Sequence, residues 1–303
     1  MKANEICINI KAYAKLNLTL EILGRRPDYY HEICSVVQTI SLADEMTLET
    51  ASGTGTMLRV QGYPVPQGDD NLVMVAVRLV EARLGESRDL EIQLKKMIPP
   101  GRGLGGGSSD AAAILRALGC LQGWTLDRRA LDAVAAETGS DVPLFLRGGL
   151  ALIAGRGEKV RRLPEPMPDY AIALAWPDVS VPTGRAYGLL EESDFSEGGH
   201  TDRLWEHLRA GGKPEPEMLY NGFERVIFEH WEPIARLAAR LSELAGVPAR
   251  LTGSGSAIFV ITPEAGRVVE AIRAEGYDAV VAHPVDHGQD LSCGPEGEEC
   301  HVR

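Results

Sequence analysis

The sequence has no excess of positive charge. Its 31 lysines and arginines stand against 43 aspartates and glutamates, which gives the 303 residues a formal net charge of −12. Broad binding to nucleic acid or to an anionic membrane surface needs a cationic face, so this balance argues against both. An anionic small molecule remains a possible ligand where a local cluster of cations meets its charge.

Long apolar runs and a regular cysteine set are also missing. No window approaches the roughly 18 apolar residues of a membrane helix, and the start MKANEICINIKAYAKLNL lacks the apolar block of a signal peptide. The five cysteines form an odd, scattered set: Cys7, Cys34, Cys120, Cys293 and Cys300. Such usage suits reduced thiols better than a disulfide framework, and we expect a cytoplasmic protein.

Length and composition predict two globular domains. Hydrophobic residues make up 44% of the chain and charged residues 24%, which is typical of packed domains. The segment PEPMP, residues 164–168, holds three prolines in five residues and fits neither helix nor sheet interior. We therefore expect an N-terminal domain over residues 1–163 and a C-terminal domain over 164–303, with a loose polar tail from about residue 287.

Hydrophobic periodicity indicates a mixture of strands and helices. Every even position from Ile6 to Ile22 is apolar, a period-two strand pattern that is long enough to predict a break near Ala14. A helix follows between a cap at Asp69 or Asp70 and a stop at Gly85. Two more helices are expected over about 109–118 and 127–138. Beyond the proposed linker, strands alternate with helices, which suggests an α+β domain.

The densest feature is the segment PPGRGLGGGSSDAAA, residues 99–113, with five glycines within residues 101–107. Glycine is costly to order, so such a run indicates close approach of the backbone to a ligand or several positive φ angles. A strand, this turn and a helix that opens on Ser-Ser-Asp would direct backbone N–H groups at a phosphate. The spacing fits neither a Walker loop nor a dinucleotide loop. The alternative is a flexible hinge before an ordinary capped helix.

The same segment resembles the phosphate loop of the superfamily that contains galactokinase, homoserine kinase, mevalonate kinase and phosphomevalonate kinase. LTGSGSAIFV is similar to the glycine-rich third motif of that superfamily. AYAKLNLTLEILGRRPDYYHEI and GSDVPLFLRGGLALIAGRGE are similar to segments of its 4-diphosphocytidyl-2-C-methyl-D-erythritol kinase family. The resemblance implies a two-domain α+β kinase fold, with a ribosomal-protein-S5-like N-terminal domain, a ferredoxin-like C-terminal domain and the active site between them.

The implied activity is ATP-dependent phosphorylation of the 2-hydroxyl of 4-diphosphocytidyl-2-C-methylerythritol, in the non-mevalonate route to isoprenoid precursors. Mg²⁺ is expected to arrive with ATP, and its protein ligands and the oligomeric state stay open. One alternative is a superfamily kinase for a smaller alcohol such as homoserine or mevalonate. Another is a catalytically silent nucleotide-binding module on the same fold.

Two residues match the family's catalytic positions. Asp141, in Gly-Ser-Asp-Val-Pro, matches the base, and Lys15 matches a residue that would keep the carboxylate ionised and stabilise charge on the transferring phosphoryl group. Taken alone, an aspartate just before Pro143 is more often a helix N-cap than a catalyst. Lys15 taken alone could be an exposed strand lysine.

The resemblance also carries over two sets of binding residues. Those for ATP are Asn71, Lys96, Pro99, Gly101, Gly103, Leu104, Gly105, Gly106, Gly107, Ser108 and Ser109. Those for the acceptor are Asn17, Tyr30, His31, Thr183, Tyr187, Gly253 and Ser254. Tyr30 and Tyr187 would hold the cytosine ring between two aromatic faces, whereas the alternative is a turn with a half-buried tyrosine. The loop 252–257 would pack near the glycine loop or the acceptor, or be a plain tight hairpin.

Two departures from the family pattern and one feature of the closing segment stand out. Tyr29 occupies a position where the family usually has glycine, so the turn before Tyr30 could differ. Arg102 stands where a small residue is usual, and would either add a cation at the phosphates or point outward. In the closing segment, the spacing of Cys293, Cys300 and His301 is not a standard zinc pattern.

Overall fold

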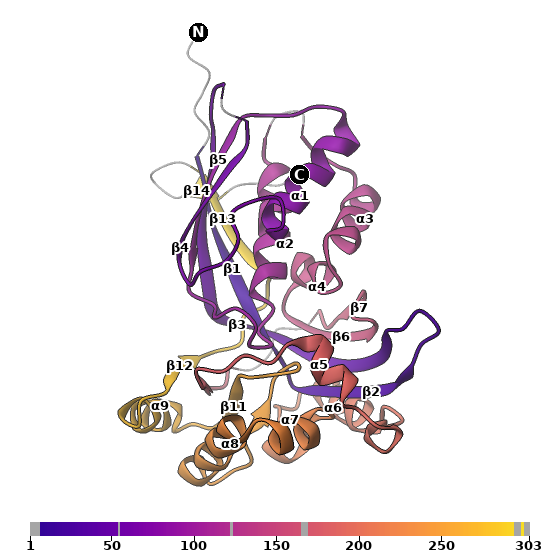
Figure 1. Ribbon diagram of the computed structural model, residues 1–303, viewed down its shortest axis with the longest axis vertical. Coiled ribbons are helices and arrows are strands. Elements are labelled where there is room, and N and C mark those ends of the chain that lie inside the picture. Colours follow the sequence, from indigo (N-terminus) through magenta and orange to yellow (C-terminus); the bar gives the residue numbers. More distant parts are fainter. Residues whose placement is uncertain (1–6, 54, 122–123, 165–168, 294–297, 300–303) are drawn as a thin grey trace.

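The computed structural model describes residues 7–53, 55–121, 124–164, 169–293 and 298–299. Figure 1 shows two parts stacked along the long axis, an upper part of strands with helices on one side and a lower part built around a smaller sheet. None of the helices in these ranges combines the length and the apolarity needed to cross a bilayer.

The larger sheet has ten strands among the described residues. They are β1 (Cys7–Asn17), β2 (Thr19–Arg25), β3 (His31–Thr50), β4 (Met57–Gly62), β5 (Leu90–Lys96), β6 (Leu150–Gly155), β7 (Lys159–Arg162), β9 (Tyr220–Asn221), β13 (Gln289–Cys293) and β14 (Glu298–Glu299). The long strand β3 joins the two parts, because residues 45–50 pair with β5 in the upper part and residues 33–38 pair with β6 lower down.

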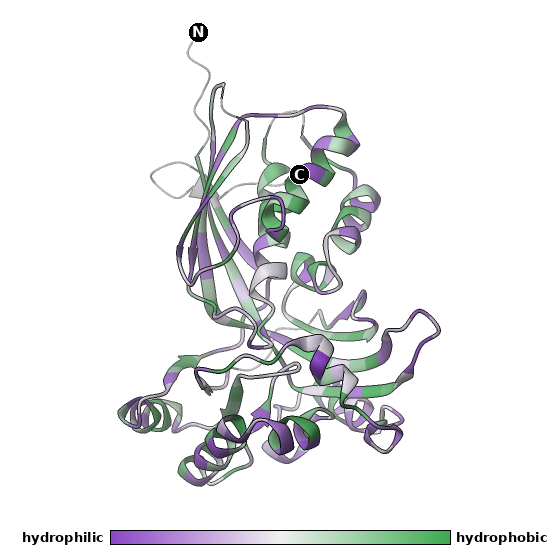
Figure 2. Cartoon of the chain, viewed as in Figure 1, coloured by the Kyte–Doolittle hydropathy of each residue, from purple (hydrophilic) through white to green (hydrophobic). Residues whose placement is uncertain are grey.

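The helices of the upper part are α1 (Leu72–Leu84), α2 (Gly106–Leu118), α3 (Arg128–Thr138) and α4 (Val142–Arg147). They cover one face of the sheet, and α2 is hydrophobic over most of its length (Figure 2). The glycine stop at Gly85 is confirmed by its left-handed φ of 69°. The expected cap at Asp69 or Asp70 is wrong, because the N-cap of α1 is Asn71, whose side chain accepts a hydrogen bond from the Val73 N–H.

The lower part has a four-stranded sheet of β8 (Ile172–Trp176), β10 (Arg250–Leu251), β11 (Ile258–Ile261) and β12 (Asp278–Ala282). Its helices are α5 (Thr183–Gly188), α6 (Gly199–Arg209), α7 (Glu224–His230), α8 (Glu232–Ala245) and α9 (Ala265–Ala274), with 3₁₀ turns at Glu192–Asp194 and Pro216–Met218. This arrangement gives the two-domain α+β architecture that the resemblance implied.

The predicted break in the first strand is confirmed as a register shift between Tyr13 and Ala14. Before the shift, Asn9 and Lys11 face solvent between buried apolar residues, as period two requires. After it both faces are buried, so Lys15 and Asn17 are only 6% and 4% exposed. Both faces are covered because here the strand passes between the two parts.

The two parts share apolar contacts. One core cluster joins Ile22 and Ile33 of the N-terminal strands to Phe223 and Ile227 of the C-terminal half. In addition, β2 pairs in parallel with β9, where Thr19 lies opposite Tyr220. Such a joint core holds the walls of any site between the parts in fixed positions.

The loose tail expected from about residue 287 is wrong for Gln289–Cys293. This segment is strand β13, which pairs antiparallel with β1 and thereby satisfies backbone groups along that strand. The Gln289 side chain also donates a 2.6 Å hydrogen bond to the carbonyl of Phe145 in α4. The chain therefore returns to the N-terminal sheet after completing the lower part. Residues 165–168 of the predicted linker, and Cys300 with His301, lie outside the described residues.

Candidate active site

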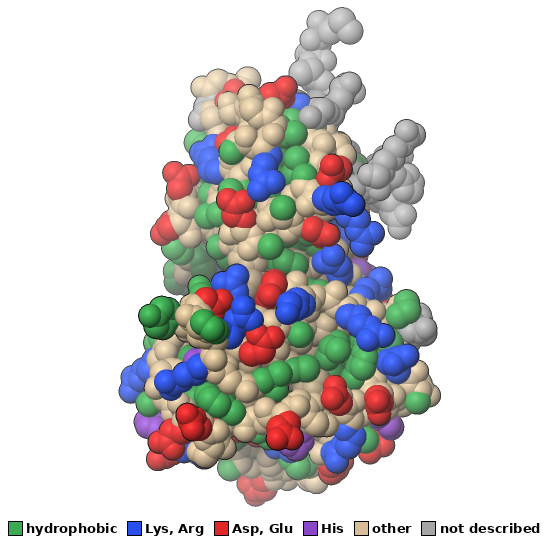
Figure 3. Space-filling model, turned by 90° about the vertical axis from the view of Figure 1, so that its right-hand side faces the viewer, with side chains coloured by type: hydrophobic (Ala, Val, Ile, Leu, Met, Phe, Trp, Pro, Cys, Tyr) green, Lys and Arg blue, Asp and Glu red, His purple; other side chains and the backbone are tan. Residues whose placement is uncertain are grey.

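A cavity of about 1160 Å³ lies where the two parts meet. Its walls come from β1, the turn between β2 and β3, the glycine loop, the start of α4, helix α5 and residues 253–254. Figure 3 shows lysine and arginine side chains gathered around the waist between the two parts on this side of the molecule. A chain with net charge −12 thus carries the local cationic surface that an anionic ligand requires.

The glycine loop turns tightly into α2. Gly101, Gly103 and Gly105 have φ angles of 68°, 77° and 73°, in the left-handed region that glycine adopts without strain. The helix begins at Gly106, three residues before the predicted start at Ser109. Ser109 N–H is bonded to the carbonyl of Gly105 at 2.9 Å, so the preceding N–H groups of the first turn remain available for an anion.

The glycine loop packs directly against the second glycine-rich segment, residues 252–257. Thr252 Oγ1 donates to the Gly103 carbonyl at 3.4 Å, and Ala257 N–H donates to the Arg102 carbonyl at 3.2 Å. A Cβ on Gly103 would lie well under 3.0 Å from the carbonyl oxygen of Thr252. Two segments about 150 residues apart thus form one wall, and the expectation that residues 252–257 pack near the glycine loop is confirmed.

Lys15 is held at the centre of this wall by Asn17. Its Nζ donates to Asn17 Oδ1 at 2.5 Å, and the same oxygen accepts from Gly253 N–H at 3.0 Å. Burial lowers the pKa of Lys15, and the negative charge of Asp141 opposes that shift. Asn17 lines the cavity, but its side chain is used mainly to position Lys15 and the 252–257 loop.

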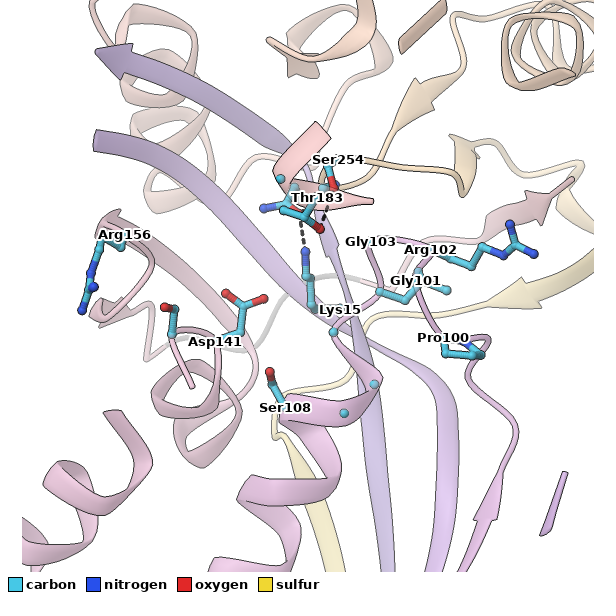
Figure 4. Close-up of a pocket in the computed structure, with 18 of the residues that line it drawn as sticks. Lys15, Pro100, Gly101, Arg102, Gly103, Ser108, Asp141, Arg156, Thr183 and Ser254 are labelled. Atoms are coloured by element: carbon cyan, nitrogen blue, oxygen red, sulfur yellow. Dashed lines mark hydrogen bonds between the residues drawn. The ribbon is translucent and has the colours of Figure 1, made fainter. Parts of the chain in front are cut away.

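Asp141 stands at the N-cap position of α4, but its side chain makes no capping hydrogen bond. Figure 4 shows Lys15, Asp141 and Ser108 directed into the same space. Helix α4 is fixed there through Phe145, because a Cβ on Gly105 would lie 2.7 Å from the Phe145 ring. The ordinary alternative for Asp141, a helix cap, therefore lacks the hydrogen bond that defines it.

Two of the residues expected to contact ATP are used inside the protein. Ser109 does not line the cavity; its hydroxyl donates to the Tyr13 carbonyl at 2.7 Å. Lys96 borders the cavity, but its ammonium is paired with Asp44 and, at 2.8 Å, with Asp110. Burial raises the pKa of Asp110, against the effect of Lys96. Asp44, which lies in β3, was not among the residues that the sequence was expected to place at this site.

Two further residues near the glycine loop, Asn71 and Arg102, use their side chains for hydrogen bonds within the protein. Asn71 caps α1 and its amide donates to the Pro66 carbonyl at 2.7 Å. Arg102 points away from Lys15 and Asp141 (Figure 4), and bonds Ser256 Oγ at 2.9 Å. Its guanidinium is thus held against the 252–257 loop. Both residues still border the cavity.

The aromatic residues expected to bind the acceptor line the opposite end of the cavity. His31 and Tyr187 stack on each other with ring centroids 4.8 Å apart, and Tyr187 also meets the edge of Phe223 at 4.9 Å. Burial raises the pKa of Tyr187 to about 12. Tyr30 is 53% exposed, and the Arg156 guanidinium lies over its ring at 4.6 Å. Arg156 also lines the cavity, and it was not among the residues expected from the sequence.

The remaining expected residues also border the cavity. Thr183 at the start of α5 and Ser254 are in contact through their hydroxyls at 3.3 Å. Those that line the cavity beside them are Pro99, Gly101, Gly103, Leu104, Gly105, Gly106, Gly107, Ser108 and Gly253. As at Gly103 and Gly105, a Cβ on Gly106 would meet the protein itself, because Ile98 and Lys96 would both lie 2.9 Å away.

Comparison with known proteins gives consistent matches. Residues 71–149 match the model of the GHMP kinases N terminal domain, and residues 207–278 match that of the GHMP kinases C terminal domain. A 4-diphosphocytidyl-2-C-methyl-D-erythritol kinase of Pseudothermotoga lettingae is 38% identical over 259 residues, which cover 85% of this chain and 92% of that protein. The enzyme of the same name from Thermotoga petrophila is 39% identical over 254 residues, 83% and 91% of the two chains.

Solved structures agree with these matches. A crystal structure of 4-(cytidine 5'-diphospho)-2C-methyl-D-erythritol kinase superimposes with a TM-score of 0.78 at 34% identity, over 91% of this chain and 98% of that one. A homoserine kinase from Cytophaga hutchinsonii has a TM-score of 0.70 at 18% identity, over 96% and 99% of the chains. At that identity, the second likeness supports the shared fold alone.

Proposed function

Because the chain belongs to the 4-diphosphocytidyl-2-C-methyl-D-erythritol kinase family of the GHMP kinases, we propose that it transfers the γ-phosphoryl group of ATP to the 2-hydroxyl of that cytidyl alcohol. The reaction is a step of the non-mevalonate route to isoprenoid precursors. The observation that carries the proposal is the convergence of Lys15, Asp141 and the start of α2 on one cavity.

The donor end is the glycine loop. The free N–H groups at the start of α2, together with the helix dipole, would hold the phosphates of ATP. Mg²⁺ would arrive coordinated by the phosphates of ATP, as is usual for this ion. Ser108, which borders the cavity in the first turn of α2, is the side chain we assign to contact that ion. When bound, Mg²⁺ would neutralise phosphate charge.

The chemistry needs a base at the acceptor hydroxyl and positive charge beside the moving group. Asp141 would accept the proton of the hydroxyl, since its carboxylate is not used as a cap. Lys15 would stabilise the negative charge that spreads over the transferring phosphoryl oxygens. Asn17 would position Lys15 through their 2.5 Å hydrogen bond.

The acceptor end distinguishes a cytidyl alcohol from homoserine or mevalonate. Tyr30, His31 and Tyr187 offer aromatic faces that a small acyclic alcohol does not need. The cavity of about 1160 Å³ lies just above the upper end of the roughly 300–1,000 Å³ usual for small-molecule sites, so it leaves room for a donor and an acceptor side by side. Arg156, whose guanidinium lies over the Tyr30 ring at this end of the cavity, would add a cation for the acceptor diphosphate.

Tyr187→Ala is expected to weaken acceptor binding. Loss of one stacking face costs roughly 1–3 kcal/mol, which corresponds to a rise in the acceptor KM of about 5- to 150-fold. The KM for ATP should barely change, because the donor phosphates bind at the glycine loop. Steady-state kinetics on both substrates would measure this split. Tyr187→Phe is the matched control and should keep both values, since it keeps the ring that packs on His31.

CMP gives an independent check of the same end of the cavity. It should compete with the acceptor and not with ATP, and Tyr187→Ala should weaken it by a similar factor. Because Tyr187 also packs against Phe223, melting temperatures must accompany the kinetics. Competition of CMP against ATP alone, or no cytidine binding by the folded protein, would favour a kinase for a smaller alcohol.

A further inference from the structure

Tyr29 combines two unfavourable features at the edge of the active-site cavity. Its side chain is 98% exposed, although tyrosine is a large and partly apolar residue. Its backbone φ is 66°, and Tyr29 is the one non-glycine residue with a positive φ in the described ranges. A bulky residue in the left-handed region is strained, and such strain persists where the surrounding structure imposes it.

The turn between β2 and β3 imposes this conformation. Arg26 N–H donates to the Tyr30 carbonyl at 2.8 Å, and Tyr29 N–H donates to the Arg26 carbonyl at 3.2 Å. Asp28 Oδ1 accepts from Tyr30 N–H at 3.2 Å, and Arg26 is paired with both Asp28 and Glu32. These bonds fix the residues on either side, so whichever residue occupies position 29 must be left-handed.

The Tyr29 ring lies where it could contact a ligand in the cavity, which would explain why a strained residue stands at this position. Tyr29 borders the cavity beside Tyr30 and His31, at the end away from the glycine loop. The Tyr30 ring already carries the Arg156 guanidinium at 4.6 Å, and His31 is stacked on Tyr187. The exposed ring of Tyr29 therefore adds a further aromatic face at this end, one that no ring or cation of the described residues is recorded as covering.

We propose that Tyr29 is a specificity-determining residue, whose ring packs over the nucleoside end of the acceptor and covers the face that opens to solvent. This assignment rests on the proposed function, because a nucleobase must reach this end of the cavity. Stacking of a base on an aromatic ring is tolerant of detail and needs only an accessible face. On this view, the Tyr29 ring is exposed and its backbone is strained in the ligand-free protein because the ring face must stay accessible to the acceptor.

The test compares Tyr29→Gly with Tyr29→Phe in the full-length protein. Tyr29→Gly removes the ring and also relieves the positive φ, so its melting temperature should rise while its KM for the cytidyl acceptor rises about fivefold, the lower end of a stacking contribution. The KM for ATP should stay unchanged. Tyr29→Phe keeps the ring and should keep the acceptor KM. A residue with only a structural role in the turn would not give higher stability together with weaker acceptor binding.

CMP binding, measured by calorimetry on the same variants, separates this inference from the proposed function. If Tyr29 covers the nucleoside, the Kd for CMP should rise about fivefold in Tyr29→Gly and stay unchanged in Tyr29→Phe. An acceptor KM and a CMP Kd within twofold of the unmodified protein in Tyr29→Gly would overturn the inference, as would an equal rise in the KM for ATP. Failure of the unmodified protein to phosphorylate the cytidyl alcohol would instead contradict the proposed function, whatever the Tyr29 variants do.

Discussion

Replacement of Asp141 by asparagine is expected to lower turnover by about 10²–10⁴-fold, the usual contribution of a positioned base. The amide has the same shape but cannot accept the proton of the acceptor hydroxyl. The fold should be preserved, because the Asp141 side chain makes no capping hydrogen bond that the change could remove. The KM for ATP should stay close to its original value, since the donor phosphates bind at the start of α2.

A matched control is available in the helix before it. Asp127 is a true N-cap, whose side chain accepts a hydrogen bond from Ala130 N–H at the start of α3, and it does not line the cavity. Asp127→Asn removes the same charge from a helix N-cap and should leave turnover unchanged. The two variants would be compared by kcat from steady-state assays and by their melting temperatures. Near-normal turnover in Asp141→Asn would contradict the assignment of Asp141 as the base.

Gly103→Ala should disrupt ATP binding and catalysis together. An alanine methyl would collide with the Thr252 carbonyl, at less than the 3.0 Å that real Cβ atoms keep, so the two glycine-rich segments must separate. A shift of reacting groups by about 1 Å can cost on the order of 10²-fold in rate. We therefore expect kcat/KM for ATP to fall by at least about 10²-fold.

The control substitution must place alanine at a positive φ, as Gly103→Ala does, but without a clash between its Cβ and a neighbouring segment. Gly85, at the end of α1, has a φ of 69°, close to the 77° of Gly103, and a Cβ there would meet nothing within 4 Å. Gly85→Ala should cost about 1–2 kcal/mol of stability and leave kcat/KM for ATP unchanged. If Gly103→Ala lost no more activity than Gly85→Ala, the contact between the two glycine-rich segments would not matter for the site.

Local sequence signals predicted much of the framework. Alternating burial from Ile8 to Ala12, the shift near Ala14 and the stop at Gly85 follow from period, strand length and glycine chemistry. The start of α2 could not be placed in this way. Glycine is a poor helix former, yet Gly106 and Gly107 form the first turn of α2, at a place where a Cβ on Gly106 would come within 2.9 Å of Ile98 and Lys96.

Contacts between segments that are far apart in the sequence could not be predicted either. Nothing near Lys96 in the sequence shows that Asp44 and Asp110 will take up its charge. Similarly, Asn17 was expected to face the substrate, whereas Gly253, more than 200 residues later, shares its side-chain oxygen with Lys15. Apart from Ser109, the residues carried over from the family resemblance all line the cavity, but only the tertiary structure shows which of them also hold other residues in place.

The central claim is tested most directly by a phosphoryl-transfer assay with the unmodified protein, ATP and three acceptors: the cytidyl methylerythritol, homoserine and mevalonate. The product should be identified by NMR as well as by ATP consumption. We predict turnover with the cytidyl alcohol, with the new phosphate on its 2-hydroxyl, and kcat/KM at least tenfold above that for either small alcohol. Preference for homoserine or mevalonate, or no ATP-dependent phosphorylation of any acceptor, would contradict the account.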